Sequence, residues 1–195
     1  MSAPLRFERV AILGLGLLGG SLALATRRAG VAKTVVAAGR RRAPLERALC
    51  EGVVDEVCDV AGAVRGADLV VLATPVGSMA RVLQEAAPQL GEGTLVTDVG
   101  SVKEMLTETL PGLLPPGVHF VGAHPMAGSH HRGVGHARAD LFDGACCVLT
   151  PLRDTDAVAC ERVAGFWRAL GARVTLRDPA RHDEEVAWVS HVPHV

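Results

Sequence analysis

The sequence predicts an α/β fold in which helices cover both faces of a doubly wound, mostly parallel β-sheet. Short apolar runs of strand length alternate with longer amphipathic stretches, which is the order of repeated strand–helix–strand units. The run Asp68-Leu-Val-Val-Leu-Ala73 is apolar after its first residue, as is typical of a central strand buried on both faces. With 195 residues, of which 49% are hydrophobic, the chain can form such a domain with a substantial core.

The first strand and helix are joined by a glycine-rich loop. Residues 10–21 read Val-Ala-Ile-Leu-Gly-Leu-Gly-Leu-Leu-Gly-Gly-Ser, with the spacing G-x-G-x-x-G. Gly14 permits the tight turn, Gly16 lets a pyrophosphate approach the backbone, and Gly19 lets the helix pack closely on the sheet. The helix begins near Leu17 and Leu18 and presents unpaired N–H groups and the positive end of its dipole to the phosphates. These residues predict a Rossmann-type dinucleotide-binding site.

A secretory signal peptide is the rival interpretation of the same stretch. Arg6 and Arg9 precede an apolar run, and Ala23-Leu24-Ala25 resembles a signal-peptidase site. The glycines would weaken a signal helix, and the chain continues directly into another strand-like run. Because strand, loop and helix occur in the order that a nucleotide site needs, we favour the nucleotide-binding interpretation.

The second strand, expected at residues 34–38, ends where an NAD-binding domain normally carries an acidic residue for the adenosine ribose. No carboxylate occurs there before Glu46, and the sequence reads Gly39-Arg40-Arg41-Arg42. Guanidinium groups bind a 2′-phosphate through charge and paired N–H donors, whereas a carboxylate would repel it. We therefore predict NADP as the preferred cofactor, with NAD as the alternative. A solvated arginine run in a surface loop is the competing interpretation.

Thr74 and Pro75 directly follow the apolar run 68–73. Loops at the carboxyl ends of parallel strands line the ligand crevice, so these residues either border the cofactor or form only a tight turn. The other elements expected in this part are a helix from Pro44 to near Gly52, a short strand around Val57, a helix over 76–90 and a strand over 94–98.

The next strand-to-helix junction, Asp98-Val-Gly-Ser-Val-Lys103, lies on the same ligand side of the predicted sheet. Asp98 is expected to border the cofactor. Ser101 has two interpretations: it caps the following helix, with Glu104 completing a capping box, or it offers its hydroxyl to a ligand. The residues of this junction alone do not decide between them.

His124 ends another expected strand, His119-Phe-Val-Gly-Ala-His124, at the edge where the ligand crevice should lie. A long polar loop with several histidines follows. The elements expected after it are a strand over 146–149, a helix over 155–170, a short strand over 173–176 and a final helix from Asp178-Pro179.

The final helix carries several histidines. His182 is followed along the helix by Ser190-His191-Val-Pro193-His194. Pro193 removes a backbone hydrogen bond, so we expect a kink, and the freed carbonyl beside two histidines is typical of a site wall. His182 and His191 lie on different sides of the helix and no cysteine is nearby, so no metal site is predicted.

Charge and composition argue against several partners. The formal net charge is −1 at pH 7, so no general attraction to nucleic acid or membrane is expected, and aromatic residues, 3% of the chain, are too few for a base-stacking surface. No apolar run outside the glycine loop is long enough to span a membrane. The odd cysteine count without a C-x-x-C indicates reduced, buried thiols and a cytoplasmic location. The cysteines are Cys50, Cys58, Cys146, Cys147 and Cys160.

Together these motifs resemble the nucleotide-binding domain of the prephenate/arogenate (cyclohexadienyl) dehydrogenases of tyrosine biosynthesis. The glycine loop is general to Rossmann folds, whereas the last two motifs are specific, and together the motifs span almost the whole chain. They are Gly14-Leu-Gly-Leu-Leu-Gly19-Gly20-Ser21, Asp98-Val-Gly-Ser101-Val-Lys, Gly122-Ala-His124-Pro-Met-Ala-Gly128-Ser, and His182-Asp with Ser190-His191-Val-Pro-His194.

The resemblance implies an NAD(P)-dependent oxidative decarboxylation of prephenate or arogenate. Hydride leaves the ring carbon that bears the hydroxyl, carbon dioxide is lost and the ring becomes aromatic. The resemblance makes His124 the catalytic histidine at the ring 4-hydroxyl, a task that suits a neutral imidazole. It makes Ser101 a residue that bonds the same hydroxyl or His124 and helps order the nicotinamide. Substrate contacts are implied for His182, His194, Ser129 and His130.

The sequence departs from the family at His130, where relatives often carry glutamate, so the loop lacks the usual residue for gating or for substrate charge. The family also continues into a helical domain that forms the homodimer and supplies an arginine for a substrate carboxylate. We therefore expect residues 1–179 to form the dinucleotide-binding domain and residues 180–195 to begin the helix toward a missing C-terminal domain. Such a truncated piece of a longer enzyme would bind cofactor with little or no turnover.

Two other functions stay open. A Rossmann reductase of the imine or β-hydroxyacid type would need a catalytic lysine and a different second domain. A nucleotide-sensing module without chemistry would keep the glycine loop but would not need Ser101, His124 and His194 together. The sequence does not distinguish prephenate from arogenate, and it does not indicate whether tyrosine exerts feedback.

Overall fold

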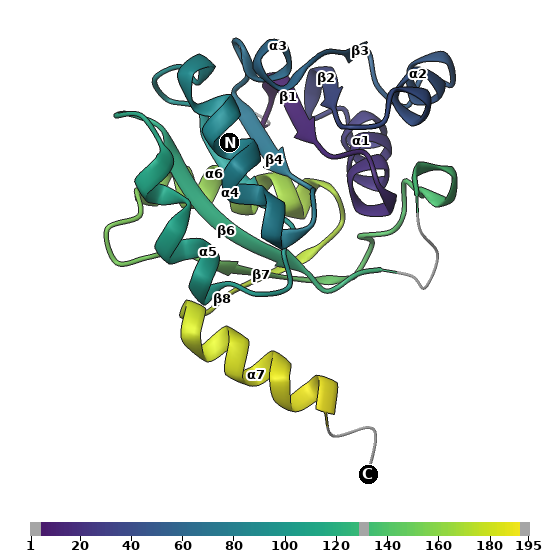
Figure 1. The fold of residues 1–195 in the computed structure, drawn as a ribbon. Coiled ribbons are helices and arrows are strands. Elements are labelled where there is room, and N and C mark those ends of the chain that lie inside the picture. Colours follow the sequence, from purple (N-terminus) through teal and green to yellow (C-terminus); the bar gives the residue numbers. More distant parts are fainter. Residues whose placement is uncertain (1–4, 129–132, 192–195) are drawn as a thin grey trace.

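The computed structural model describes residues 5–128 and 133–191, with side chains up to residue 188. One eight-stranded sheet forms its centre, with the strand order β3-β2-β1-β4-β5-β6-β7-β8 (Figure 1). All neighbouring strands in it are parallel except β6 and β7, which are antiparallel. The strands are β1 (Phe7–Leu13), β2 (Ala32–Ala38), β3 (Glu56–Val57), β4 (Leu69–Leu72), β5 (Leu95–Asp98), β6 (His119–Pro125), β7 (Cys146–Thr150) and β8 (Arg173–Leu176). The predicted Rossmann-type fold is confirmed.

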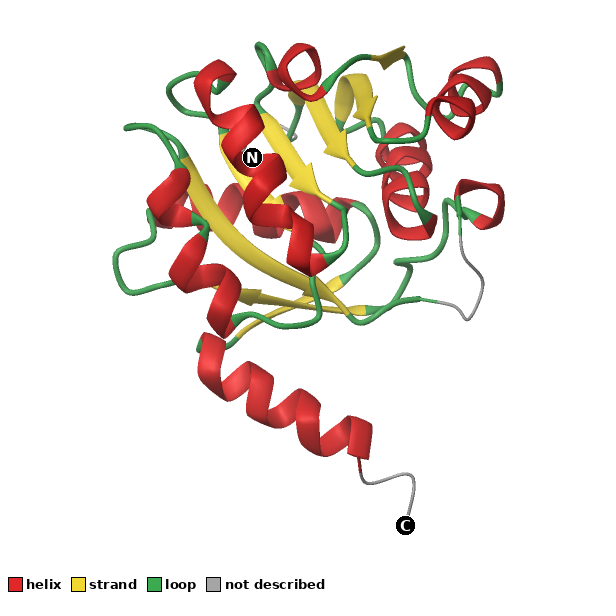
Figure 2. Ribbon diagram, viewed as in Figure 1, coloured by secondary structure: helices red, strands yellow, loops and turns green. Residues whose placement is uncertain are grey.

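Helices lie on both faces of this sheet (Figure 2). The helices of the described residues are α1 (Leu17–Ala29), α2 (Arg42–Cys50), α3 (Val60–Val64), α4 (Val76–Ala86), α5 (Glu104–Thr109), α6 (Ala157–Ala169) and α7 (Pro179–His191), with the short 3-10 turns η1 (Ala87–Gln89), η2 (Pro111–Leu113) and η3 (Val134–His136). The alternation of strands and helices along the chain therefore follows the predicted order.

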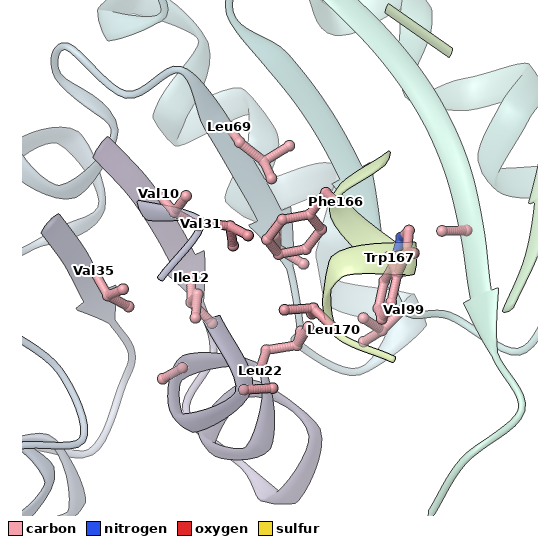
Figure 3. Packing of buried hydrophobic residues seen from close by; sticks show 14 of the residues in the cluster. Val10, Ile12, Leu22, Val31, Val35, Leu69, Val99, Phe166, Trp167 and Leu170 are labelled. Atoms are coloured by element: carbon pink, nitrogen blue, oxygen red, sulfur yellow. The ribbon is translucent and has the colours of Figure 1, made fainter. Parts of the chain in front are cut away.

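Alternate residues of β1 face two different core layers. Val10 and Ile12 pack with α1 and α6, including the buried Trp167 (Figure 3). Ala11 and Leu13 pack on the other face with α3, α4 and α5. Every residue of β4 is buried because this central strand is covered on both faces, which explains its uninterrupted apolar sequence.

The end of α4 and the start of α6 differ from the sequence prediction for local reasons. Helix α4 ends at Ala86 and continues as a 3-10 turn, because Pro88 has no N–H to extend the α-helical hydrogen bonding. Helix α6 begins at Ala157, where the Asp156 carboxylate accepts the backbone N–H of Ala159 and caps the helix.

Helix α7 projects from the body of the domain (Figure 1). It contacts α5 and β7, whereas the Trp188 side chain farther along the helix is 73% exposed. The predicted boundary between residues 179 and 180 falls within the first turn of this helix, and the division into domains stays a prediction.

The cysteines all carry free thiols, but the predicted burial holds fully only for Cys147: Cys50 is exposed, and the other three are partly buried. Burial raises the pKa of the Cys147 thiol, so little of it is present as the reactive thiolate at neutral pH. Across residues 5–128 and 133–191, no helix combines the length and apolar character needed to cross a membrane.

Candidate cofactor and active site

A cavity of about 420 Å³ opens at the carboxyl ends of β1, β2 and β4. Its walls are the glycine loop after β1, the loop after β2, the loop after β4 and one face of α4. Nucleotides bind to this edge of a doubly wound sheet because successive loops diverge there and leave a crevice.

Backbone geometry at the glycine loop matches the roles predicted for two glycines. Gly14 has φ of +106° and donates its N–H to the carbonyl of Ala38 at 2.8 Å. A Cβ at Gly14 would lie 2.7 Å from the carbonyl oxygen of Ala73, so a side chain is excluded by conformation and by space. A Cβ at Gly19 would lie 2.0 Å from the carbonyl oxygen of Gly14, which shows how closely α1 approaches the loop.

The loop has room for the phosphates of a dinucleotide. Gly16 lines the cavity, and no heavy atom lies within 4 Å of the position a Cβ would take there. Helix α1 begins at Leu17, so the backbone N–H groups of Leu17, Leu18 and Gly19 lie in its first turn, where they lack intrahelical partners. The Leu17 and Leu18 side chains do not line the cavity, so the groups that these residues offer to the phosphates are their backbone N–H groups.

The predicted arginines separate into two groups. Gly39, Arg40 and Arg41 line the cavity. Arg42 is the first residue of α2, is 90% exposed, and pairs with Glu46 one turn later at 2.7 Å. The helix thus begins two residues before the proline at which the sequence places its start, and Arg42 is directed to its own helix rather than to the cavity.

Other charged side chains also reach the cavity, and the sequence reasoning missed them. Arg81 from α4 adds a third cation, while Asp59 and Glu85 add carboxylates. The Asp59 carboxylate is already engaged, because it accepts the N–H of Gly62 and caps α3. Arg81 gives no local sequence signal, since only the packing of α4 beside β1 brings it to this edge.

Thr74 and Pro75 both line the cavity, as one of their two interpretations requires. The Thr74 hydroxyl oxygen is buried and has no hydrogen-bond partner in the part of the chain that the structure describes. A buried hydroxyl without a partner is costly, so it is a natural place for a ligand group to bind. Together with the open space at Gly16, this unsatisfied atom indicates that the residues present fit a dinucleotide.

Asp98 lies below the ligand edge rather than on it. It is fully buried and forms an ion pair with the buried Lys103. Its Oδ1 accepts the N–H of Ala123 at 3.0 Å, and its Oδ2 accepts the N–H of Gly100 at 2.7 Å. Burial raises the pKa of Asp98 and lowers that of Lys103, and the contact between the two opposes both shifts. Because its side chain is fully buried and does not line the cavity, Asp98 is not placed for the predicted cofactor contact and instead holds the backbone of Gly100 and Ala123.

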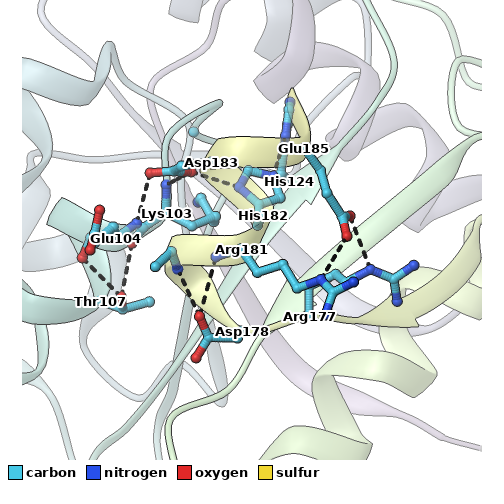
Figure 4. A network of polar contacts seen from close by, with 12 residues as sticks. Lys103, Glu104, Thr107, His124, Arg177, Asp178, Arg181, His182, Asp183 and Glu185 are labelled. Carbon is cyan, nitrogen blue, oxygen red and sulfur yellow. Dashed lines mark hydrogen bonds and ion pairs between the residues drawn. The ribbon is translucent and has the colours of Figure 1, made fainter. Parts of the chain in front are cut away.

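The cap of α5 is not Ser101, which corrects one of the two interpretations of that residue. Helix α5 starts at Glu104, and the carboxylate of Asp183 on α7 accepts the N–H of Lys103 at 2.8 Å and of Glu104 at 3.0 Å (Figure 4). Ser101 is exposed and makes no side-chain hydrogen bond within the described residues, so its hydroxyl is available to a ligand.

His124 is half-buried at the carboxyl end of β6 and contacts the second predicted histidine, His182 (Figure 4). His124 Nδ1 lies 2.9 Å from His182 Nε2, and the two rings are nearly perpendicular. His182 Nδ1 lies 2.7 Å from Asp183 Oδ1. Burial, His182 and Lys103 lower the pKa of His124 to about 4, against a weaker opposing effect of Asp183. His124 is therefore neutral at physiological pH.

Three predicted substrate contacts, Ser129, His130 and His194, lie outside the described residues, as does the kink predicted at Pro193. Among residues 5–128 and 133–191, no three His, Cys, Asp or Glu residues gather in a group that could hold a metal ion.

Comparison with known proteins gives a consistent set of relatives. The family described as prephenate dehydrogenase, nucleotide-binding domain, matches residues 22–176. The cyclohexadienyl dehydrogenase of Zymomonas mobilis is 37% identical over 190 residues, 97% of this chain and 64% of the relative. The prephenate dehydrogenase of Bacillus subtilis is 36% identical over 191 residues, 96% of this chain and 51% of the relative.

A solved structure agrees with these relatives. The prephenate dehydrogenase of A. aeolicus in complex with hydroxyphenyl propionate and NAD+ superposes with a TM-score of 0.89 at 31% identity, covering 100% of this chain and 66% of that one. The chain thus spans about half to two thirds of the length of the proteins it resembles.

Proposed function

We propose, because this chain belongs to the prephenate dehydrogenase family, that the complete protein oxidatively decarboxylates prephenate or arogenate, with NADP as the preferred cofactor. The observation that carries the proposal is the neutral His124 at the end of β6, on the same sheet edge as the dinucleotide cavity. The strand order supports an adenosine end near β2 and a nicotinamide end near β5 and β6.

The residues of this chain account for the proton chemistry. When bound, the oxidised nicotinamide accepts a hydride from the ring carbon that bears the hydroxyl. His124 accepts the hydroxyl proton as the hydride leaves, which favours the ketone-like transition state. Carbon dioxide then departs without its bonding electrons, the ring becomes aromatic, and its oxygen recovers a proton. Ser101 offers a second hydrogen bond to the same hydroxyl. Orientation of the ring supplies more of the rate than proton transfer does.

The complete protein, in this proposal, continues into a helical domain that forms a homodimer and contacts the substrate carboxylates. A steady-state assay of the complete protein with each substrate and each cofactor tests the function. The 195-residue chain is the comparison in the same assay, and we expect it to bind cofactor with little turnover. Turnover by the complete protein of neither prephenate nor arogenate would overturn the proposal.

The position of the lysines argues against an imine or β-hydroxyacid reductase whose catalytic lysine lies in this chain. The lysines are Lys33 and Lys103. Lys103 is fully buried in its ion pair with Asp98, and Lys33 pairs with Glu8 at 3.2 Å beside the amino end of β1, away from the ligand edge. Neither ammonium group can reach a substrate at the carboxyl ends of the strands.

Replacing Arg40 or Arg41 by serine is expected to raise the Kd for NADP about tenfold and to leave the Kd for NAD within about twofold. The reason is that a charge-assisted hydrogen bond contributes about 1.5–3 kcal/mol, reduced at this exposed position by solvent. Isothermal titration with each cofactor measures both constants. Arg42→Ser is the matched control, because Arg42 belongs to the same run but lies outside the cavity. Equal wild-type affinity for the two cofactors would contradict NADP preference.

The pH dependence of kcat/KM is expected to follow the lowered pKa of His124, about 4 instead of 6.5. Above this pKa the imidazole is neutral and accepts the proton, so kcat/KM should be level through the neutral range. Below pH about 4 the imidazole is protonated, and kcat/KM should fall about tenfold per pH unit. Rates are measured against pH, with aliquots returned to pH 7 to identify irreversible unfolding. An acid limb centred near pH 6.5, the ordinary value for histidine, would contradict this assignment.

A further inference from the structure

His182 and Asp183 form a hydrogen-bonded chain with His124 that leaves His182 no free ring nitrogen. His182 Nε2 faces His124 Nδ1 at 2.9 Å, and His182 Nδ1 faces Asp183 Oδ1 at 2.7 Å. The His182 side chain is 1% exposed. A substrate therefore has neither a surface of His182 to contact nor a nitrogen to bind, so the substrate-binding role expected from the sequence does not fit this geometry.

We propose that His182 and Asp183 are positioning residues that fix the ring orientation and tautomer of His124, so that its Nε2 is the free proton acceptor. The catalytic consequence rests on the function proposed above, whereas the tautomer itself does not. Neither residue touches the reacting atoms in this proposal, and both act through His124.

Both imidazoles are taken as neutral in this proposal, and the hydrogen-bonding capacities of the groups then determine the direction of the chain. An ionised carboxylate only accepts, so the Nδ1 of His182 carries a hydrogen and donates it to Asp183. In a neutral imidazole the other nitrogen is an acceptor, so Nε2 of His182 accepts from the Nδ1–H of His124. The remaining nitrogen of His124, Nε2, then carries a lone pair. This is the form that removes a hydroxyl proton.

Asp183 is itself held by two backbone donors on a different element. Its Oδ1 accepts the N–H of Lys103 at 2.8 Å, and its Oδ2 accepts the N–H of Glu104 at 3.0 Å. Those residues follow Ser101 closely in the chain. One carboxylate on α7 therefore fixes both the segment that carries Ser101 and, through His182, the ring of His124 (Figure 4). The two side chains proposed to bind the substrate hydroxyl are positioned by the same anchor.

Contact between the two rings also contributes to packing, so a test must separate packing from hydrogen bonding. The ring centroids of His124 and His182 lie 5.1 Å apart with an interplanar angle of 76°. His182→Phe keeps an aromatic ring in this buried place but removes the acceptor for His124. His182→Gln loses the ring but can place an amide oxygen near the former Nε2. Phenylalanine is therefore the better replacement for packing, and glutamine is the better one for the hydrogen bond.

The first experiment measures the tautomer of His124 by NMR of the chain labelled with ¹⁵N at histidine, with His124→Gln used to assign the signal. We expect at pH 7 a hydrogen on Nδ1 and none on Nε2, and in His182→Phe a mixture of the two neutral tautomers. A hydrogen on Nε2 in the wild type, or an unchanged single tautomer in His182→Phe, would overturn the proposal. This measurement needs no turnover, so it decides the inference even if neither proposed substrate reacts.

The second experiment compares kcat and KM of the complete enzyme for His182→Phe and His182→Gln. We expect kcat to fall about 10–100-fold in His182→Phe with KM within about threefold, and partial recovery of kcat in His182→Gln. The melting temperature is expected to fall less in His182→Phe than in His182→Gln, because phenylalanine preserves the packing of the ring. His119→Phe, the same replacement at the other end of β6, is the matched control and should retain wild-type kcat. A kcat for His182→Phe equal to or above that of His182→Gln would show that the role is packing alone and would overturn the proposal.

Discussion

Replacing His124 by asparagine is expected to lower kcat of the complete enzyme by about 10²–10⁴-fold, the range typical for a positioned proton acceptor. Asparagine keeps a polar group at the end of β6 but cannot take up a proton. We expect a loss in the lower half of this range, because a pKa of about 4 makes His124 a modest base and leaves much of the rate to orientation. Steady-state rates with saturating NADP and either substrate measure the loss.

The replacement of His124 by asparagine should lower kcat and leave the affinity for the cofactor unchanged. His124 is not among the residues that line the dinucleotide cavity, so the Kd for NADP should stay within about twofold of wild type. His119→Asn changes a histidine at the opposite end of the same strand and serves as the control for stability and for kcat. Turnover by His124→Asn at the wild-type rate would remove His124 from the mechanism.

Structural features that depend on residues adjacent in the sequence can be predicted from it. The glycine loop and β4 are examples, because a turn that needs a positive φ and a strand buried on both faces leave local patterns. The antiparallel pairing of β7 with β6 leaves no such pattern. It arises from a connection through a long loop, and the apolar sequence of a buried strand reads the same in either direction.

The residue types of the candidate site could be predicted from the sequence, but the hydrogen bonds and ion pairs between the residues could not. Arg40, Arg41 and Thr74 each follow a strand at the ligand edge and line the cavity, while their contact with a cofactor stays a prediction. The position of Arg42 in the sequence does not show that its side chain pairs with Glu46 of the same helix. The sequence also cannot show that the cap of α5 comes from Asp183, because that contact joins residues about 80 positions apart and exists only once α7 has packed.

The ion pair of Asp98 and Lys103 is the contact whose loss should cost most stability. Lys103 donates to Asp98 and, at 2.9 Å, to the carbonyl oxygen of Ala123, directly before His124. Lys103→Met removes one charge and leaves the Asp98 carboxylate buried without its cation. We expect the free energy of unfolding of the chain to fall by about 3–5 kcal/mol, as for other buried pairs that lose one partner. Urea unfolding followed by circular dichroism measures the change.

A double-mutant cycle separates the value of the pair from the cost of an orphaned charge. In the double variant Asp98→Asn/Lys103→Met the asparagine side chain is neutral, and its amide oxygen can still accept the N–H of Ala123. We therefore expect the double variant to lose at least about 1 kcal/mol less than the sum of the two single variants. Arg42→Met, which breaks an exposed pair, should cost no more than about 0.5 kcal/mol and is the control. Strict additivity would mean that the two charges do not depend on each other. In that case the cost of Lys103→Met would have to come from the lost hydrogen bond to Ala123 and from packing, not from the ion pair.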